Sequence, residues 1–290
     1  MRRSMLFLPG NSPNMLINGN CLGSDAIIFD LEDAVAPAEK DAARILVRNT
    51  MTYMDFRGCE TIVRINSIDT PYWQKDLDEI LPCKPNLILL PKTCSAQDVA
   101  AADSYMAELE ARLGFAPNTV GLMPLIETAL GVENAFSIAS ASNRVQALFL
   151  GAEDLTADLR CKRTKEGREI EYARTRLVVA ARAAGVEVYD TPFTDVNDDE
   201  GIWTDAELAK ALGFSGKASI SPRHVDVINQ VFSPSQADID YAYEVLDAIA
   251  LAKAQGKGAI SLRGKMIDAP IVSRAEQTIA TAVALGLGRS

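Results

Sequence analysis

Short apolar runs alternate with longer amphipathic segments over most of the chain. Segments with apolar residues three or four positions apart predict helices at residues 37–56, 71–81, 95–113, 129–141, 169–184 and 198–212. Runs of three to five mostly apolar residues predict eight strands, at residues 4–8, 26–29, 61–65, 87–90, 122–126, 147–150, 186–189 and 218–220. This alternation predicts an α/β fold with parallel strands.

Eight repeats of the alternation favour a closed (β/α)8 TIM barrel over a doubly wound sheet. A doubly wound dinucleotide-binding sheet would carry a G-x-G-x-x-G loop after its first strand, and the sequence contains none. In a TIM barrel the catalytic groups lie at the carboxyl ends of the strands. Residues that directly follow the predicted strands are therefore the first candidates for a site.

More chain follows the eighth strand than barrel closure requires. Residues 234–255 predict a long helix, a Gly-rich link follows at 256–258, residues 259–267 alternate weakly, and 270–287 predict a final helix. We place a TIM-barrel catalytic domain at residues 1–232 and a C-terminal helical extension at 233–290. Such an extension is expected to cover an active site, either its own or that of a neighbouring subunit.

Two carboxylates end adjacent predicted strands in the middle of the chain. Glu127 follows the run at 122–126, and Asp154 comes shortly after the run at 147–150. Parallel strands bring their carboxyl ends to one edge, so the two side chains should emerge side by side. Such a pair suits Mg²⁺, completed by water and substrate oxygens. The alternative is that each residue only caps a helix.

Composition limits the classes of function. The 290 residues are 48% hydrophobic and 23% charged, and the formal charge of −10 argues against a nucleic-acid or anionic-membrane surface. No apolar run approaches the ~20 residues that cross a bilayer. The five cysteines form no Cys-x-x-Cys pair, which is typical of reduced thiols and predicts a cytoplasmic protein. His224 is the single histidine and precedes a predicted helix, so we expect it to be a surface or capping residue.

Seven stretches along the whole chain resemble the HpcH/HpaI aldolase-like family of acyl-CoA lyases, to which the citrate lyase β-subunit belongs. They follow the family's order at residues 2–10 (RRSMLFLPG), 29–35 (FDLEDAV), 63–66 (VRIN), 90–92 (LPK), 125–128 (LIET), 151–154 (GAED) and 264–270 (GKMIDAP). The resemblance implies a TIM barrel, Mg²⁺ dependence and retro-Claisen cleavage of a 3-hydroxyacyl thioester.

The resemblance also implies roles for individual residues. Glu127 and Asp154 match the metal ligands, and Arg64 matches the clamp for the carboxylate of the 2-oxo-acid product, which its guanidinium could hold through two parallel hydrogen bonds. Asp268 matches an acid–base residue of the C-terminal segment, although an Asp before Ala-Pro is also an N-cap pattern. The basic candidates for the phosphates of a pantetheine carrier are Arg2, Arg3, Lys40 and Lys92.

Three acidic residues after the second strand, Asp30, Glu32 and Asp33, are candidates for the surroundings of the metal. Glu32 and Asp33 could orient metal-bound water or simply cap the next helix. Lys40 could equally be a solvated helix residue.

We predict a lyase that cleaves a citryl thioester, on coenzyme A or an acyl carrier protein, to oxaloacetate and an acetyl thioester. Its expected partners are the α and γ subunits of a citrate lyase, and the family implies a homo-oligomer, either a trimer or a multiple of it. One alternative is a stand-alone citramalyl-CoA or malyl-CoA lyase. The other is a non-catalytic scaffold, against which the set Arg64, Glu127, Asp154 and Asp268 argues.

Overall fold

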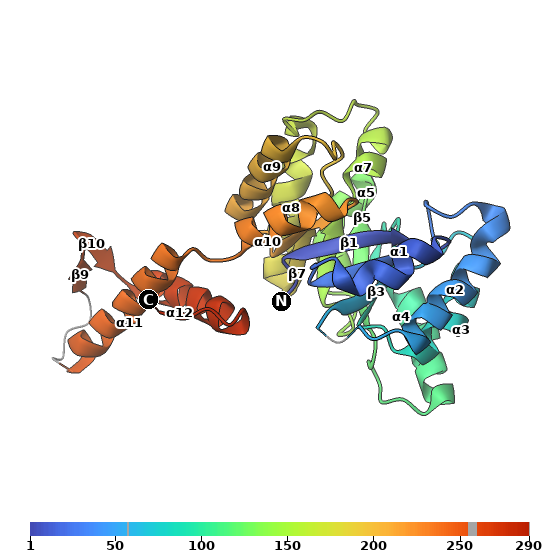
Figure 1. The fold of residues 1–290 in the computed structure, drawn as a ribbon, viewed down its shortest axis with the longest axis horizontal. Coiled ribbons are helices and arrows are strands. Elements are labelled where there is room, and N and C mark those ends of the chain that lie inside the picture. The colour runs from blue at the N-terminus through green and yellow to red at the C-terminus, as the bar shows by residue number, and fades with distance from the viewer. Residues whose placement is uncertain (57, 255–259, 290) are drawn as a thin grey trace. The chain divides into compact units, whose positions relative to one another are not determined.

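Eight parallel strands close into a barrel in the computed structural model, which describes residues 1–56, 58–254 and 260–289. Each strand pairs with the next, and β8 returns to pair with β1, with Ser4 opposite Lys217. The strands are β1 (Ser4–Pro9), β2 (Ala26–Asp30), β3 (Glu60–Arg64), β4 (Leu87–Leu90), β5 (Gly121–Ile126), β6 (Ala147–Leu150), β7 (Glu187–Asp190) and β8 (Gly216–Ser219) (Figure 1). The prediction of a TIM barrel is confirmed.

The strands form because both of their faces are buried. All four residues of β4 are buried, and they alternate between the barrel interior and the surrounding helices. Leu87 and Leu89 belong to the interior cluster, together with inward-facing residues such as Met123 and Phe149. Burying a Leu or Phe side chain contributes about 1.5–3 kcal/mol each. These side chains fill the barrel, so a ligand can enter only at its ends.

Helices follow the strands and cover the outside of the barrel. They are α2 (Lys40–Tyr53), α3 (Trp73–Ile80), α4 (Ala96–Leu113), α5 (Ala129–Glu133), α6 (Ala135–Ala139), α8 (Glu171–Ala184) and α9 (Asp199–Leu212). Helix α4 begins with a capping box between Ser95 and Asp98, and it ends at Gly114, whose φ of 70° suits a residue without a Cβ atom. The single helix predicted at residues 129–141 is two short helices that meet at Asn134.

Two further short helices were not predicted, α1 (Pro13–Asn18) and α7 (Ala152–Asp158), whereas α10 (Val225–Phe232) begins directly after His224, as expected. The first two directly follow β1 and β6 at the carboxyl end of the barrel, where they are too short to show a clear helical period. Their position matters because the carboxyl ends of the strands carry the candidate residues.

The contacts divide the chain into two compact units, Arg2–Asn229 and Gln230–Ser290 with Met1. The second unit contains α11 (Gln236–Ala254), the antiparallel pair β9 (Ile260–Leu262) and β10 (Lys265–Ile267), and α12 (Ala269–Ala284). Its own small core includes Val245, Ile267 and Ala275. The Gly-rich link at residues 256–258 lies outside the described residues. The assignment of this extension as a cover for an active site stays a prediction.

No helix in the described part of the chain combines the length and apolar character needed to cross a membrane.

Candidate active site

A cavity of about 440 Å³ opens where the carboxyl ends of the barrel strands meet. This volume lies in the range of small-molecule sites. Its lining combines apolar side chains with charged ones and comes from nearly every strand end: Phe7, Pro9, Met15, Asp30, Asp33, Ala34, Arg64, Leu125, Glu127, Phe149, Gly151, Ala152, Glu153, Asp154, Thr191, Pro192 and Ile220.

Seven charged side chains at or beside this cavity are linked to one another by ion pairs or hydrogen bonds, and we call them the mouth cluster. They comprise five carboxylates and two cations: Asp30, Glu32, Asp33, Glu127, Asp154, Arg64 and Lys92. The carboxylates outnumber the cations, so the cluster carries a net negative charge when all are ionised. The sequence predicted that these strand-end residues would meet, and the structure brings them together.

Arg64 is held on the β2 side of the cluster. Its Nε and Nη2 atoms donate to the two carboxylate oxygens of Asp30, at 2.7 and 2.6 Å. Its Nη1 atom lies 3.1 Å from Glu32 Oε2 and 3.4 Å from Asp33 Oδ2, and the guanidinium stacks over the ring of Phe7. Although burial opposes its charge, Asp30 and Glu32 raise the pKa of Arg64 above its ordinary value.

This geometry corrects the predicted use of Arg64. Asp30 occupies the Nε/Nη2 edge, so a substrate carboxylate cannot take the same two parallel bonds while that pair is in place. The Nη1 atom contacts Glu32 and Asp33, at 3.1 and 3.4 Å, so a substrate carboxylate would bind there by replacing one of these contacts. Asp30 also accepts backbone N–H bonds from Glu32 and Ala34, at 2.9 and 3.1 Å, and therefore positions Arg64 and the loop after β2.

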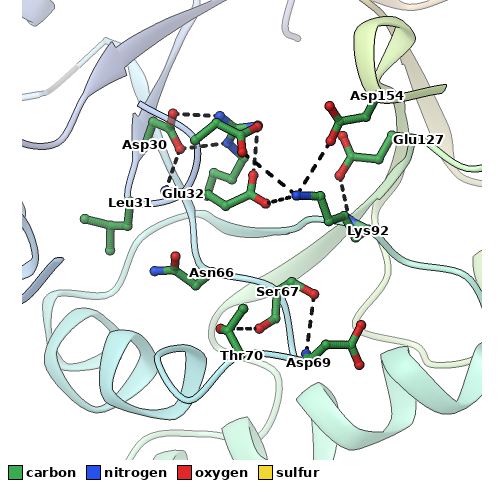
Figure 2. A network of polar contacts seen from close by, with 12 residues as sticks. Asp30, Leu31, Glu32, Asn66, Ser67, Asp69, Thr70, Lys92, Glu127 and Asp154 are labelled. Carbon is green, nitrogen blue, oxygen red and sulfur yellow. Dashed lines mark hydrogen bonds and ion pairs between the residues drawn. The ribbon is translucent and has the colours of Figure 1, made fainter. Parts of the chain in front are cut away.

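Lys92 lies between the two sides of the cluster. Figure 2 shows its side chain reaching between Glu32, 2.9 Å from its Nζ atom, and Asp154, at 3.7 Å. Partial burial opposes the ammonium charge, but Glu32, Asp33 and Asp154 raise the pKa of Lys92. Its backbone has a φ of 50°, a left-handed conformation that is costly for a residue with a side chain and that clusters at functional sites.

Glu127 is the most deeply buried carboxylate on the β5 side. Its residue is 3% exposed, and Oε1 accepts the backbone N–H of Lys92 at 2.7 Å. Burial, helped by repulsion from Glu32 and Asp154, raises the pKa of Glu127 to about 8. Gly151 makes room for this side chain, because a Cβ atom there would lie 2.6 Å from Glu127 Oε2.

Comparison with known proteins connects this geometry with a family. The model of the HpcH/HpaI aldolase/citrate lyase family matches residues 3–222. A citrate lyase subunit beta from Leuconostoc mesenteroides subsp. cremoris is 42% identical over 279 residues, which cover 96% of this chain and 92% of that protein.

The chain belongs to the HpcH/HpaI aldolase/citrate lyase family.

Two solved structures from Mycobacterium tuberculosis agree with this membership. The protein CitE in complex with magnesium, acetoacetate and coenzyme A is 31% identical, with a TM-score of 0.79, and covers 97% of this chain and 98% of its own. A citrate lyase beta subunit complexed with oxaloacetate and magnesium is also 31% identical, with a TM-score of 0.69, and covers 80% of this chain and 97% of its own. The predicted family and the predicted class, a carbon–carbon lyase, are confirmed.

The mouth cluster fits a divalent cation that binds mainly to water and substrate. Among residues 1–56, 58–254 and 260–289, no three or more His, Cys, Asp or Glu side chains are arranged to hold a metal ion by themselves. Mg²⁺ is usually held by one or two carboxylates with water and substrate oxygens, which the pair Glu127 and Asp154 can supply. Burial, with repulsion from Glu32 and Asp154, raises the pKa of Glu127, and a cation bound beside it would favour the ionised form.

Three of the predicted phosphate ligands are bound to other groups of the protein. Arg2 and Arg3 precede β1, so they lie at the amino end of the barrel, opposite the cavity, where they pair with Glu60 and Asp25 at 2.7 and 2.8 Å. Lys40 is buried, and its Nζ atom donates to the backbone oxygens of residues 31 and 32, at 2.8 and 2.6 Å. Burial lowers the pKa of Lys40. All three side chains thus have structural contacts in this protein, and their predicted binding of phosphate stays a prediction.

The fourth predicted phosphate ligand, Lys92, does face the cavity region, but its ammonium is held by carboxylates. The nearest is Glu32, at 2.9 Å. We therefore count Lys92 as a member of the mouth cluster and not as a phosphate ligand.

Asp268 and His224 had two possible roles each. Asp268 is exposed and is the N-cap of α12, where its side chain accepts the backbone N–H of Ile271. The capping interpretation is thus observed, and the acid–base role stays a proposal. His224 is fully buried against the ring of Phe193, with a centroid distance of 6.1 Å, and neither ring nitrogen has a hydrogen-bond partner among the described residues. The expectation of a surface residue is wrong.

Sequence reasoning missed the apolar part of the cavity. Phe7 and Phe149 have ring centroids 6.0 Å apart and line it, and the exposed side chains of Met15 and Ile220 line it as well. The alternation along β1 and β6 could have marked Phe7 and Phe149 as inward-facing residues near the carboxyl ends. Met15 lies on the short helix α1, whose sequence shows no helical periodicity.

Proposed function

We propose that this protein is a Mg²⁺-dependent lyase that cleaves a citryl thioester to oxaloacetate and an acetyl thioester. The observation that carries the proposal is the cavity in which Glu127 and Asp154 face Arg64 across a cluster with excess negative charge. The relatives support it, since one is a citrate lyase subunit beta and another is bound to magnesium and oxaloacetate.

The reaction has three requirements. The hydroxyl proton must leave, the carbon–carbon bond must break with its electron pair passing to the thioester enolate, and the enolate carbon must then take up a proton. Mg²⁺ held by Glu127 and Asp154 would bind hydroxyl and carboxylate oxygens of the substrate and lower the pKa of that hydroxyl. The remaining steps fall to the side chains of the chain itself.

Arg64 and the apolar wall position the substrate. Arg64 lines the cavity, and its Nη1 atom can donate to the carboxylate of the departing oxaloacetate in place of Asp33. Phe7 and Phe149 exclude water from the reacting carbons, which strengthens the electrostatic interactions of the neighbouring charges. Asp30 fixes the direction of the guanidinium through its two hydrogen bonds.

Asp268 is the proposed donor of the proton to the enolate. It is exposed at the start of α12 in the C-terminal unit, and the proposal assigns it to the cavity of its own or of another subunit. Its capping bond from Ile271 fixes the side chain without a salt bridge among the described residues.

The first experiment measures oxaloacetate released from citryl-CoA with Mg²⁺ and with excess EDTA, for the wild type and for Asp268→Asn. The proposal expects release that needs Mg²⁺ and that falls by at least about 100-fold in the variant. The matched control is Asp238→Asn, because Asp238 also caps a helix of the same unit, through Ser235. Equal losses in both variants would assign Asp268 to capping alone.

Citramalyl-CoA and malyl-CoA are the comparison substrates in the same assay. Turnover of either one in preference to citryl-CoA would keep the lyase chemistry and change the acyl group. If citryl-CoA, citramalyl-CoA, malyl-CoA and a citryl carrier protein are all left unchanged, the result would favour the scaffold hypothesis for the isolated chain.

The proposed setting is a citrate lyase complex in the cytoplasm, with α and γ subunits and with several copies of this chain. The named relative supports the complex, and the five free cysteines agree with a reducing compartment.

A further inference from the structure

A strongly basic loop follows α7 on the cavity side of the barrel. Residues 160–168 (RCKRTKEGR), here called the basic loop, contain five Lys or Arg and one Glu, in a chain whose net charge is −10. The loop comes after β6 and α7, whose first residues line the cavity. The proposed reaction uses none of its residues.

Internal bonds hold the loop in one conformation. Glu169 accepts bonds from Thr164 N and Oγ1, at 2.8 and 2.7 Å, and from Arg163 Nη1, at 2.8 Å. Although burial opposes its ionisation, these bonds lower the pKa of Glu169 to about 2, so it stays charged at neutral pH. Lys165 forms an ion pair with Asp198. A loop that is already ordered loses less entropy when a partner binds.

Three cations of the basic loop point outward. Arg160, Lys162 and Arg168 are exposed, and within residues 1–56, 58–254 and 260–289 none of them has an ion-pair partner. Arg163 links the loop to the cavity, because its Nε atom lies 3.6 Å from Oε1 of Glu153, a lining residue. The basic loop thus begins beside the cavity, and its unpaired cations follow within the same nine residues.

Exposed apolar side chains adjoin these charges. Leu159 at the end of α7 is 43% exposed and Leu130 at the start of α5 is 59% exposed. The two helices are fastened together next to these residues, since Asp158 Oδ2 accepts the backbone N–H of Ala129 at 2.7 Å. An apolar centre with a charged rim is the composition of a protein-binding surface.

We propose that the basic loop, with Leu130 and Leu159, is the docking surface for an acidic carrier protein that presents the acyl thioester to the cavity. The inference rests on the proposed function and names the partner of that site. The cations are dispersed over an exposed loop, which suits an extended acidic surface, whereas a single phosphate group is usually bound by donors that converge on it. Opposite charges also speed the encounter of enzyme and carrier.

Binding is tested first, with the full-length protein and a carrier protein that bears phosphopantetheine. The charge-reversal variant Lys162→Glu/Arg168→Glu should weaken the carrier Kd by at least about tenfold and flatten its dependence on salt. The control variant Lys75→Glu/Arg112→Glu changes the charge equally at exposed positions of α3 and α4, and its Kd should stay within about twofold of the wild type. Failure of the wild type to bind the carrier, or equal weakening in both variants, would overturn the docking surface.

Turnover then separates the carrier from coenzyme A. In Lys162→Glu/Arg168→Glu the KM for the citryl carrier protein should rise by about tenfold while kcat is unchanged, and both constants for citryl-CoA should stay within about twofold. An equal rise in both KM values would show that the loop binds the nucleotide phosphates of coenzyme A, contrary to the proposal. Carrier binding without any turnover would refute the proposed function and leave the docking surface intact.

Discussion

Two clusters of charged side chains in the barrel unit differ in their ratio of cations to carboxylates. Arg174, Asp190, Lys217 and Asp205 form an inner network with two cations and two carboxylates, all buried, with N···O distances of 2.6 to 2.8 Å. The mouth cluster contains the same kinds of side chain, but five carboxylates face two cations and a cavity adjoins them.

The pKa values of the carboxylates follow this difference. Although burial opposes it, Lys217 and Arg174 lower the pKa of Asp205. Glu127 is as deeply buried and lacks such a partner, so its pKa is raised to about 8. Buried charges in balance stabilise a fold, whereas carboxylates in excess at the lining of a cavity are available to a cation and a substrate.

The largest expected effect is on catalysis at the mouth cluster. Glu127→Gln and Asp154→Asn each remove a proposed metal ligand, so turnover of citryl-CoA at saturating Mg²⁺ should fall on the order of 10³-fold. Both variants should remain folded, because each removes one carboxylate from a cluster in which carboxylates outnumber cations. Steady-state kinetics measures the loss, and a fall of less than about tenfold in both would contradict their role as ligands.

The next effect is on stability at the inner network. Lys217→Met leaves Asp190 and Asp205 with one cation between them, and should lower the free energy of unfolding by about 3–5 kcal/mol. Glu32→Gln is the matched change in the mouth cluster and should alter it by less than about 1 kcal/mol. Denaturant titrations of the metal-free proteins measure both. Equal destabilisation would abolish the contrast between the two clusters.

A smaller effect concerns pH. In the metal-free protein Glu127 has a folded-state pKa of about 8, above its ordinary 4.5, so the folded state holds a proton that the unfolded state has lost. The stability of the wild type should therefore decrease as pH rises from 4.5 to 8, by at most about 1.4 kcal/mol per pH unit from this group. Unfolding of Glu127→Gln over the same range should lack this contribution. An identical pH slope in the two proteins would show that folding does not raise the pKa of Glu127.

The smallest effect is expected at the exposed edge of the mouth cluster. The side chain of Asp33 is 54% exposed and lies 3.4 Å from Arg64 and 3.9 Å from Lys92. Solvent screens such pairs, so Asp33→Asn should change the free energy of unfolding by less than about 0.5 kcal/mol and turnover by less than about twofold. A loss of turnover comparable with that of Asp154→Asn would place Asp33 among the metal ligands.

The strands and the meeting of the strand-end residues could be predicted because both follow from local patterns. Residues 87–90 form β4 where four apolar residues stand between Asn86 and Pro91, and parallel pairing of β5 with β6 then places Glu127 near Asp154. The alternation of strand and helix was enough to select a barrel, since it repeats eight times.

Partners that depend on register or on distant side chains could not be predicted. Asp30 pairs with Arg64 because β2 and β3 place these two residues opposite each other, which the sequence does not reveal. Lys40 has the sequence context of a solvated helix residue but folds back onto the loop after β2. His224 has the sequence context of a capping residue, but Phe193, 31 positions earlier in the chain, packs against its ring.

The most direct test of the account is a calorimetric titration of the metal-free protein with Mg²⁺, for the wild type, Glu127→Gln and Glu110→Gln. Glu110 is buried and paired with Arg144 at 2.8 Å, away from the cavity, so it controls for the loss of a buried carboxylate. We expect one Mg²⁺ site in the wild type and in Glu110→Gln, and a site weakened by at least about 10-fold in Glu127→Gln. Equal Mg²⁺ affinity in the wild type and Glu127→Gln would contradict the claim that the unbalanced carboxylates of the mouth cluster form the metal site.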